Sequence, residues 1–425
     1  MESHRHASLL TPGRAVLFLA PFAMLAGQVW ATYSRVESMG KNADFFMDDI
    51  SIFDNPANMN IFPNFLIGEM GTYQQTAISG NTAPTNMDPA NSWFGGIFSY
   101  SLGKQKDPPS LYPQLSLGGA FNRKDQELFI MVPDSADGNL VPTPATNFDG
   151  FLGLTLANGG MLGSHVYVAN QEGADLGDGS SPAIYGAGIR LMALRADIGV
   201  NWPVARNMDA ELSLGGALLG YGPSSIDPEF SFFAKARAFS TLEVINGELV
   251  PMLSYSHLRS PGMESERYKL GMGVNVSLDR GFFWLGLHGF VDHDLSAWDL
   301  VGNTKVYRSG QSTQSENVMF GSIIGFGIER NIWWDWLVLR VGGQKVIAYR
   351  EEDGPLADDK RSFYYTNPTG DMTPDDHVGF GVGINVEEKL KVDATLAEDL
   401  LYTFGNLFSR PQHHLISRIS ATYSF

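Results

Sequence analysis

Apolar and polar residues alternate along several segments of this chain. From Tyr268 to Leu278, the even-numbered residues are apolar and the odd-numbered residues are lysine, glycine, asparagine or serine. Successive side chains of a β-strand point to opposite faces, so the segment predicts a strand with one apolar face and one polar, glycine-rich face. The same alternation recurs at residues 111–121, 210–218, 378–386 and 390–396. The pattern predicts an all-β chain.

The last residues of the chain form another alternating segment. Its apolar side carries Leu415, Ile419, Ala421, Tyr423 and Phe425. Its polar side carries Arg418, Ser420, Thr422 and Ser424. An amphipathic last strand that ends in an aromatic residue resembles the C-terminal assembly signal of bacterial outer-membrane β-barrels. We therefore expect Tyr423 and Phe425 to be recognised by a barrel-assembly machinery, and the protein to reside in the bacterial outer membrane.

The first residues have the features of a secretory signal peptide. Arg5 and Arg14 precede an apolar stretch over residues 15–27, and Val29 and Ala31 fall where a signal peptidase reads small residues. We therefore expect residues 1–31 to be removed in the mature protein. A helix over the apolar stretch is about 20 Å long, shorter than the roughly 30 Å hydrocarbon core, which disfavours the alternative of a membrane anchor.

Composition fits a barrel and excludes several classes of function. The 425 residues suffice for one large β domain or for several smaller ones, and they include 47 glycines and 12% aromatic residues. The mean hydropathy of −0.09 is compatible with membrane strands, because alternating faces average out. The net charge of −17 repels phosphate backbones, so we expect no nucleic-acid partner. The lack of cysteine excludes disulfides, thiolate metal sites and cysteine nucleophiles.

Two kinds of connection separate the candidate strands. Short turns are predicted at residues 158–160, 246–247, 279–281, 330–331 and 387–389. Long polar connections are predicted at residues 171–182, 294–316 and 350–377. Short turns at one rim and long loops at the other are typical of outer-membrane barrels, whose long loops lie outside the cell.

These features predict that residues 63–425 form a transmembrane antiparallel β-barrel. Its apolar faces would contact outer-membrane lipid, and its glycine-rich polar faces would line a wet or lightly filled lumen. Counting candidate strands gives about 17, whereas single-chain bacterial barrels normally have an even number. We therefore expect about 14 strands, with about 16 as the alternative.

Two aromatic clusters lie next to predicted short turns, at residues 282–284 and at residues 333–336. Membrane barrels carry girdles of aromatic residues at both lipid–water interfaces, so we expect these clusters to belong to such a girdle. The alternative is that they are core aromatics of a soluble β protein.

An acidic segment that ends in Asn-Pro-Ala precedes the first predicted strand. Asp54 and Asn55 can cap backbone N–H groups, and Pro56 keeps its predecessor out of the α region, which suits a loop tip. Together with an upstream Arg-x-x-x-Met-Gly sequence, the segment resembles the N-terminal signature of the FadL-like long-chain fatty-acid transporter superfamily of outer-membrane proteins. The matching positions are Arg35, Met39, Gly40, Asp48, Asp49, Ser51, Asn55, Pro56 and Ala57. Asn58 stands where the family usually has glycine.

The resemblance implies a barrel of about 14 strands whose N-terminal segment, residues 32–62, folds back into the lumen as a plug. The plug motif would consist of Asp48, Asp49, Ser51, Asn55, Pro56 and Ala57. The Asn-Pro-Ala turn would lie inside the barrel. Turn chemistry alone leaves open the alternative of an ordinary linker.

No constellation in the sequence indicates catalysis, a metal site or a cofactor. Asp292-His293-Asp294 opens a long loop, but adjacent strand residues point to opposite faces and a metal needs several convergent ligands. We expect a solvated rim there, and His413-His414 is a weaker candidate for the same reason. Carboxylates of the predicted outer loops either bridge to lipopolysaccharide through divalent cations or keep the loops soluble. They are Asp175, Asp178, Asp353, Asp358, Asp359, Asp375 and Asp376.

Two functions agree with these features, neither of them enzymatic. The first is an outer-membrane channel for passive uptake of small hydrophobic or amphipathic compounds. The alternative is an outer-membrane barrel subunit of a protein secretion machine, which binds exported proteins through its external loops, as some barrels resembling this superfamily do. An apolar lumenal pocket favours the first, and protein-binding loops favour the second. The polar inward faces argue against a purely apolar tunnel.

Overall fold

The structure is a computed structural model. It describes residues 32–71, 92–102, 113–133, 135–136, 139–141, 147–172, 189–222, 227–297, 299–301, 304–307, 315–354, 357–364, 377–387, 389–396 and 416–425. The chain divides into two units, Met1–Trp30 and Ala31–Phe425, and only the second contains described residues. The predicted signal peptide, His413-His414 and most of the acidic loop residues lie outside the described residues.

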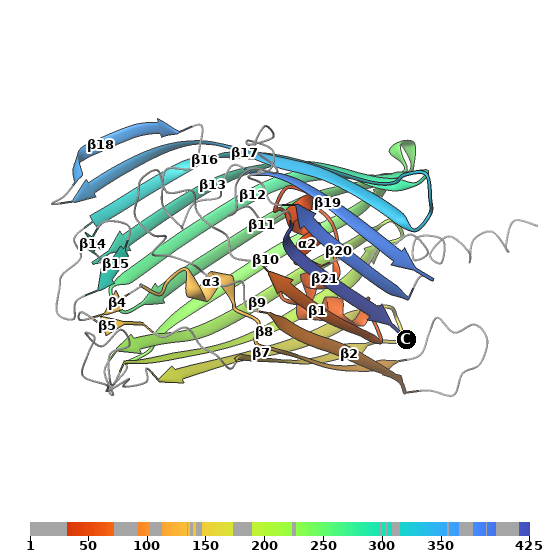
Figure 1. The fold of residues 1–425 in the computed structure, drawn as a ribbon, viewed down its shortest axis with the longest axis horizontal. Helices are drawn as coiled ribbons and strands as arrows, with labels where there is room; N and C mark the ends of the chain where they lie inside the picture. The colour runs from red at the N-terminus through yellow and green to blue at the C-terminus, as the bar shows by residue number, and fades with distance from the viewer. Residues whose placement is uncertain are drawn as a thin grey trace, which may run out of the picture. The chain divides into compact units, whose positions relative to one another are not determined.

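Within the described residues, sixteen antiparallel strands form a closed ring (Figure 1). In pairing order they are β1 (Phe65–Gly71), β2 (Trp93–Ser101), β3 (Gln114–Phe121), β6 (Asn147–Thr155), β7 (Met161–Glu172), β8 (Arg190–Ala205), β9 (Met208–Gly222), β10 (Glu229–Leu242), β11 (Gly247–Ser260), β12 (Met263–Leu278), β13 (Gly281–Ser296), β16 (Ser315–Asn331), β17 (Leu337–Gly354), β19 (His377–Val386), β20 (Leu390–Leu396) and β21 (Ile416–Ser424). The first strand closes the ring by pairing with the last along its whole length.

The expected number of about 14 strands is therefore wrong, and 16, the alternative, is correct. A further strand of the same sheet, β18 (Ala357–Tyr364), pairs only with the last part of β17 and stays outside the ring. The short strands β4 (Ser135–Ala136), β5 (Asn139–Leu140), β14 (Asp299–Val301) and β15 (Thr304–Tyr307) form a separate small sheet. Neither the count of candidate strands nor the resemblance shows how the strands pair, and closure of the ring depends on that pairing.

The two rims of the ring differ in most of their connections, as the sequence predicts, although a short turn also joins β11 to β12 at the rim of the long connections. Tight turns join β8 to β9, β12 to β13 and β19 to β20 at the rim where the chain ends, which we call the turn end (Figure 1). The connections at the opposite rim, the loop end, include the long segments after β7, β13 and β17. The turn after β16 lies at residues 332–336, slightly later than predicted.

The wall of the ring is uneven in length. β1, β20 and β21 have 7, 7 and 9 residues, whereas β12, β16 and β17 have 16, 17 and 18. Figure 1 shows the short strands near the C-terminus, in front of the longer ones. The short strands make fewer ladder hydrogen bonds, and the N-terminal segment contacts several of them.

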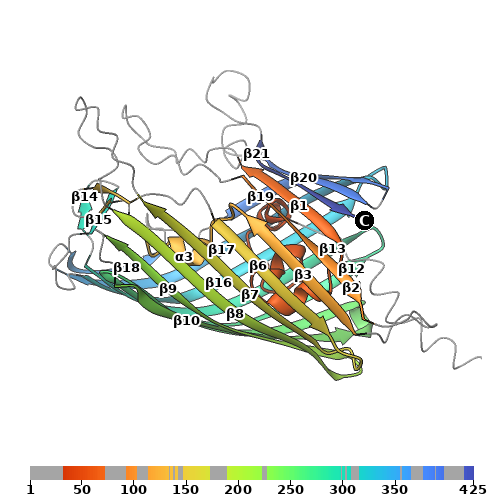
Figure 2. The same cartoon turned by 90° about the horizontal axis from the view of Figure 1, so that it is seen from below.

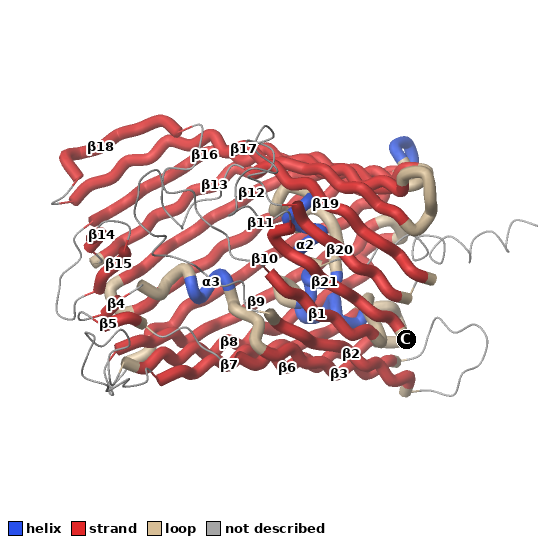
Figure 3. The backbone as a smooth tube through the Cα atoms, in the orientation of Figure 1, coloured by secondary structure: helices blue, strands red, loops and turns tan. Residues whose placement is uncertain are grey.

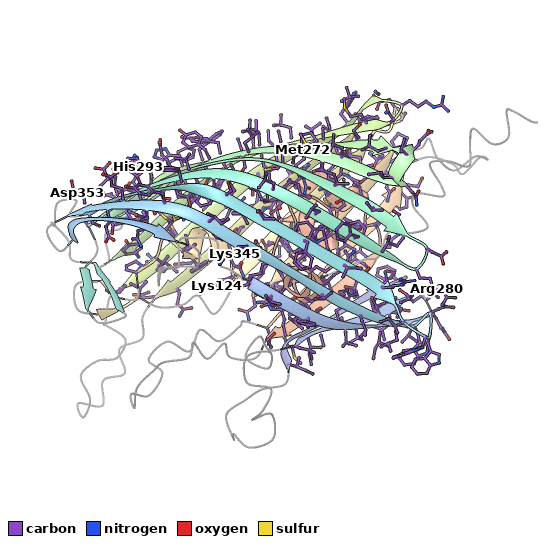
Figure 4. All side chains as sticks on the ribbon, turned by 90° about the horizontal axis from the view of Figure 1, so that it is seen from above. Lys124, Met272, Arg280, His293, Lys345 and Asp353 are labelled. Atoms are coloured by element: carbon purple, nitrogen blue, oxygen red, sulfur yellow. The ribbon has the colours of Figure 1, made fainter. Side chains whose placement is uncertain are left out.

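The alternation along each strand separates the two faces of the wall. On β12 the side chains of Tyr268, Leu270 and Met272 point outward and are about half exposed or more, whereas Gly271 and Asn275 point inward and are buried. Figure 4 shows Met272 on the outer surface. An apolar outside and a polar inside reverse the polarity of a soluble protein and match a barrel surrounded by lipid. The protein is therefore assigned to the bacterial outer membrane.

The N-terminal segment, residues 32–62, lies inside the ring (Figure 2). Its described helices are α2 (Tyr33–Ser38), η3 (Asp49–Ile52) and η4 (Pro56–Asn60). Helix α2 contacts β17, β19, β20 and β21, whereas η4 contacts β3, β6, β7 and β8, so the segment reaches from one side of the wall to another. Where the N-terminal segment lies, the lumen is filled, because the segment packs against inward glycines of the wall. The expectation of a lightly filled lumen is wrong for this part of the barrel.

A second segment also turns into the barrel. Residues 122–133, which we call the α3 loop, follow β3 and contain α3 (Gln126–Phe129). Leu128 and Met131 of this loop are fully buried in an apolar cluster with inward side chains of β7 to β12. Figure 3 shows α3 and the short helices of the N-terminal segment enclosed by the strands. None of the described helices is long and apolar enough to cross a membrane.

The two aromatic clusters lie in different surroundings. Trp333, Trp334 and Trp336 are exposed at the turn end, as a girdle requires. Trp284, by contrast, is fully buried inside the barrel, with its ring 5.8 Å from that of Phe46. Even-numbered residues of β13 point inward, so the girdle expectation is wrong for this tryptophan. It fills the lumen against the N-terminal segment.

Candidate lumenal site

The Asn-Pro-Ala turn lies against the inward faces of β7 and β8. The Asn55 side-chain oxygen accepts a hydrogen bond from the Ala57 N–H at 3.1 Å, and the Asn55 amide donates to the Val200 carbonyl at 3.3 Å. The first of these bonds caps η4. A Cβ on Gly163 would overlap the backbone of Pro56, so only glycine permits this close approach.

The acidic residues of the predicted motif are buried beside this turn. Asp48 pairs with Arg35 at 3.3 Å, and the Thr422 hydroxyl donates to Asp49 at 3.3 Å. The Ser51 hydroxyl donates to the Asp48 backbone carbonyl. Burial raises the pKa of Asp49 well above its usual value, and the Asp48 carboxylate raises it further. Asp49 therefore keeps its proton at pH values where an exposed aspartate is ionised.

Arg35 links the N-terminal segment to the barrel wall. Its guanidinium donates to Glu329 on β16 at 2.8 Å. Glu329 also accepts from Arg340 on β17 at 2.5 Å, and Arg340 pairs with Asp393 on β20 at 2.6 Å. All four side chains are buried. Removing one member of such a network leaves a buried charge unpaired, which typically costs about 3–5 kcal/mol.

A ring of six ionisable side chains joins the α3 loop to β6, β7 and β8. In order of contact its members are Arg123, Asp149, His165, Asp197, Arg195 and Asp125. His165 is the link on β7, with Nε2 2.8 Å from Asp149 and Nδ1 2.8 Å from Asp197. The two arginines both reach Asp125 of the loop, at 3.5 and 3.3 Å, and so close the ring. Ion pairs thus hold the loop inside the barrel.

A cavity of about 440 Å³ lies between the N-terminal segment and the α3 loop. Strands β10, β11 and β12 form one wall, which carries Lys235, Lys269 and Arg267. Phe233 contributes an apolar surface next to these cations and belongs to the apolar cluster under the α3 loop. The cavity is therefore amphipathic, which a purely apolar tunnel is not.

Asp44 of the N-terminal segment neutralises part of this wall. Its carboxylate pairs with Lys235 at 2.5 Å and lies 3.2 Å from the His288 imidazole. Burial opposes ionisation of Asp44, but the Lys235 ammonium and His288 outweigh it and hold the pKa of Asp44 well below its ordinary value. Lys235 also pairs with Asp54 at 2.8 Å. Its charge is therefore satisfied within the protein.

The Asp292-His293-Asp294 sequence forms no site. Asp292 and Asp294 point into the barrel and are buried, whereas His293 points outward and pairs with Glu316 at 2.8 Å. The sequence predicted that neighbouring side chains would point to opposite faces, as they do. It also predicted that this segment would be a solvated rim, which is wrong for Asp292 and Asp294 because both are buried. The described residues contain no group of three or more histidine, aspartate or glutamate side chains placed to hold a metal ion.

No family model matches this chain, and no curated protein matches it. A deltaS2 mutant of TodX, a monoaromatic hydrocarbon channel, is similar with 12% identity and a TM-score of 0.39, over 92% of this chain and 98% of that chain. CdiB from Escherichia coli is similar with 10% identity and a TM-score of 0.41, over 85% and 63%. BamA from Haemophilus ducreyi, lacking POTRA domains 1–3, is similar with 11% identity and a TM-score of 0.37, over 85% and 70%.

TodX is a FadL-family channel, and the N-terminal motif of this chain resembles that family. Likenesses at these identities and TM-scores assign neither a family nor a function to this chain. The lumenal geometry carries the functional conclusion instead.

Proposed function

We propose that this protein is an outer-membrane channel for passive uptake of small amphipathic compounds, closed by its N-terminal segment. The observation that carries the proposal is the position of the 440 Å³ cavity between the N-terminal segment and the α3 loop. A solute that enters from the loop end meets the α3 loop, then the cavity, then the N-terminal segment. The cavity would thus be a binding site on the permeation route, with the α3 loop as a barrier on one side and the N-terminal segment as a barrier on the other.

Both barriers can move without unfolding the barrel. The wall satisfies its own backbone hydrogen bonds as a closed ring, so it needs neither segment for that purpose. The N-terminal segment and the α3 loop are attached to it through side chains, such as the pairs Arg35–Glu329 and Arg123–Asp149. Ligand binding that favours the released arrangement shifts the population towards an open channel.

The lining suits solutes with both a polar and an apolar part. Apolar surface that a solute buries against Phe233 contributes about 25 cal/mol per Å². Its polar part meets the charged and hydroxyl groups of β11 and β12. Movement down a concentration gradient requires no energy coupling.

The test is deletion of residues 48–59, measured on purified barrel in planar bilayers and liposomes. We expect a folded, heat-modifiable barrel with higher conductance and faster uptake of benzyl alcohol, a small amphipathic probe. Val244→Ser, at a fully exposed turn residue, is the control variant and should behave as wild type. A folded deletion variant with unchanged permeation contradicts the channel. If permeation is unchanged and the variant no longer binds an exported protein that the wild type binds, the secretion-subunit function replaces the channel function.

A further inference from the structure

The two barriers of the proposed channel touch each other through Arg123 and Phe53. The guanidinium of Arg123, on the α3 loop, lies 3.9 Å from the centroid of the Phe53 ring, on the N-terminal segment. A cation at this distance is attracted by the negative face of the aromatic ring. Arg123 is 4% exposed and Phe53 is 7% exposed, so the contact is shielded from water.

Arg123 also fastens the α3 loop to the wall. Its guanidinium pairs with Asp149 on β6 at 2.6 Å, and its backbone carbonyl accepts a hydrogen bond from the Asn147 amide at 3.1 Å. An ion pair is stronger where water is excluded from it, because the effective dielectric constant is lower there. Phe53 covers the guanidinium of this pair. The seated N-terminal segment therefore strengthens the attachment of the loop.

Phe53 is held by the wall and the loop together. Its ring packs edge to face against Trp93 on β2 and Phe151 on β6, at 5.7 and 5.5 Å between ring centroids. Arg123 adds a contact from the loop. When the loop moves away, part of the Phe53 ring meets water, and the exposure of apolar surface to water is unfavourable. The seated loop therefore also stabilises the seated segment.

The contact adjoins the cavity between the two barriers. Tyr33, which stacks on Phe53 at 6.4 Å, lines the cavity from the N-terminal segment, and Gln126 and Glu127 line it from the α3 loop. The cavity is thus bounded by two elements that hold each other in place. A solute in the cavity that displaces one of them also loosens the other.

We propose that the contact between Arg123 and Phe53 couples the two barriers, so that release of either one favours release of the other. The proposal rests on the proposed channel for the role of the two segments as barriers, whereas the coupling is a property of their contact. Coupling is reciprocal, so the segment holds the loop by the same factor as the loop holds the segment. For a cation–π contact this factor is about three to thirty.

The test is labelling of single buried thiols with a charged maleimide in the intact, detergent-solubilised protein. The chain contains no cysteine, so an introduced cysteine is the only thiol. Met131 of the loop and Met59 of the segment are fully buried, and a buried thiol reacts only when its segment is released. Met131→Cys therefore reports release of the loop, and Met59→Cys reports release of the segment.

Each barrier is then perturbed while the other is observed. We expect Phe53→Leu to raise the labelling rate of Met131→Cys, and Arg123→Gln to raise that of Met59→Cys, each about three- to thirtyfold. With Arg123→Gln already in place, Phe53→Leu should no longer change the labelling of Met131→Cys, because the contact between the two side chains is already lost.

Phe46→Leu is the matched control. Phe46 lies on the same segment as Phe53, but its ring packs against Phe282 and Trp284 on β13. This variant should change the labelling of Met131→Cys far less than Phe53→Leu does. Heat-modifiability and the far-UV spectrum confirm that each variant is folded. If Phe53→Leu does not fold, the deletion of residues 48–59, which also removes Phe53, takes its place and should raise the labelling of Met131→Cys at least as much.

Three results would overturn the coupling: unchanged labelling of Met131→Cys in the folded Phe53→Leu variant, an equal effect of Phe46→Leu, or an effect of Phe53→Leu that persists with Arg123→Gln. The channel function fails independently, through unchanged permeation in the 48–59 deletion. Faster permeation of that variant without faster labelling of Met131→Cys leaves the channel standing and rejects only the coupling.

Discussion

A Cβ atom on Gly199 would overlap the side-chain oxygen of Asn55. The two residues meet inside the barrel, where Asn55 caps η4 and Gly199 belongs to the inward face of β8. The glycine-rich face of the wall is therefore the counterpart of the N-terminal segment, shaped to let its backbone approach closely. This contact offers a way to displace the segment from the side of the wall.

We expect Gly199→Val to displace the N-terminal segment while leaving the barrel folded. The added side chain occupies the position of the Asn55 oxygen, and the segment is easier to move than a hydrogen-bonded strand. Single-channel conductance should rise towards that of the 48–59 deletion. Gly289→Val is the matched control, because Gly289 is an outward-facing glycine whose Cβ would have 4.0 Å of clearance. Equal conductance in the two variants contradicts a closing role for the segment.

Orientation of the wall predicts a strong asymmetry on β12. Met272→Arg places a charge on the lipid-facing side, where it should cost about 2–4 kcal/mol if the residue lies near the bilayer midplane. Asn275→Arg, on the lumenal side, should cost much less, because its charge meets the Glu248 carboxylate instead of lipid. Folding titrations into liposomes measure both costs. Equal losses of folding free energy would refute the assignment of faces.

Channel closure should depend on pH through Asp49. Its raised pKa means that the seated segment binds more protons than the released one, where the pKa returns towards its ordinary value of 3.8. The seated state is therefore favoured at low pH, and this advantage is lost as the pH rises from 3.8 through the raised value. Conductance should rise across that window in the wild-type protein.

Asp49→Asn should remove this pH dependence and keep the channel closed, because the amide is neutral throughout. Asp335→Asn, at an exposed aspartate of the turn end, is the control and should retain the wild-type profile. A pH profile that is the same in Asp49→Asn and wild type would show that another group controls the seating.

The C-terminal aromatic should act during assembly and contribute little to final stability. Phe425 is 54% exposed and lies beside Phe98 and Tyr423, at 5.4 and 6.5 Å between ring centroids, so its removal deletes little buried surface. We expect Phe425→Ala to lower the amount of folded barrel in cells, without changing thermal stability of the refolded protein. Phe94→Ala, at another exposed aromatic of the outer face, is the comparison. Equal amounts of folded protein in the two variants would argue against an assembly signal.

Several features of the fold followed from local sequence alone. The alternation at Tyr268 to Leu278 and at residues 378–386 fixed which side chains face outward, because the direction of a strand side chain depends only on its position in the strand. The turn residues near Asn246 and Arg280 marked tight connections, because turn chemistry is also local. Charged residues at the inward positions 195 and 197 of an alternating strand indicate that ion pairs form in the lumen. The sequence does not show which residues are their partners.

Other features were decided only by the tertiary structure. Ring closure by 16 strands depends on the register of every pair, and the N-terminal resemblance gave a different number. Arg35 meets Glu329 across 294 positions of sequence, and Trp284 turns inward to pack on Phe46. Side-chain alternation assigns a residue to a face, whereas its partner across the lumen depends on the curvature of the closed wall. The sequence therefore determined the two faces of the barrel, and the closed ring determined what fills it.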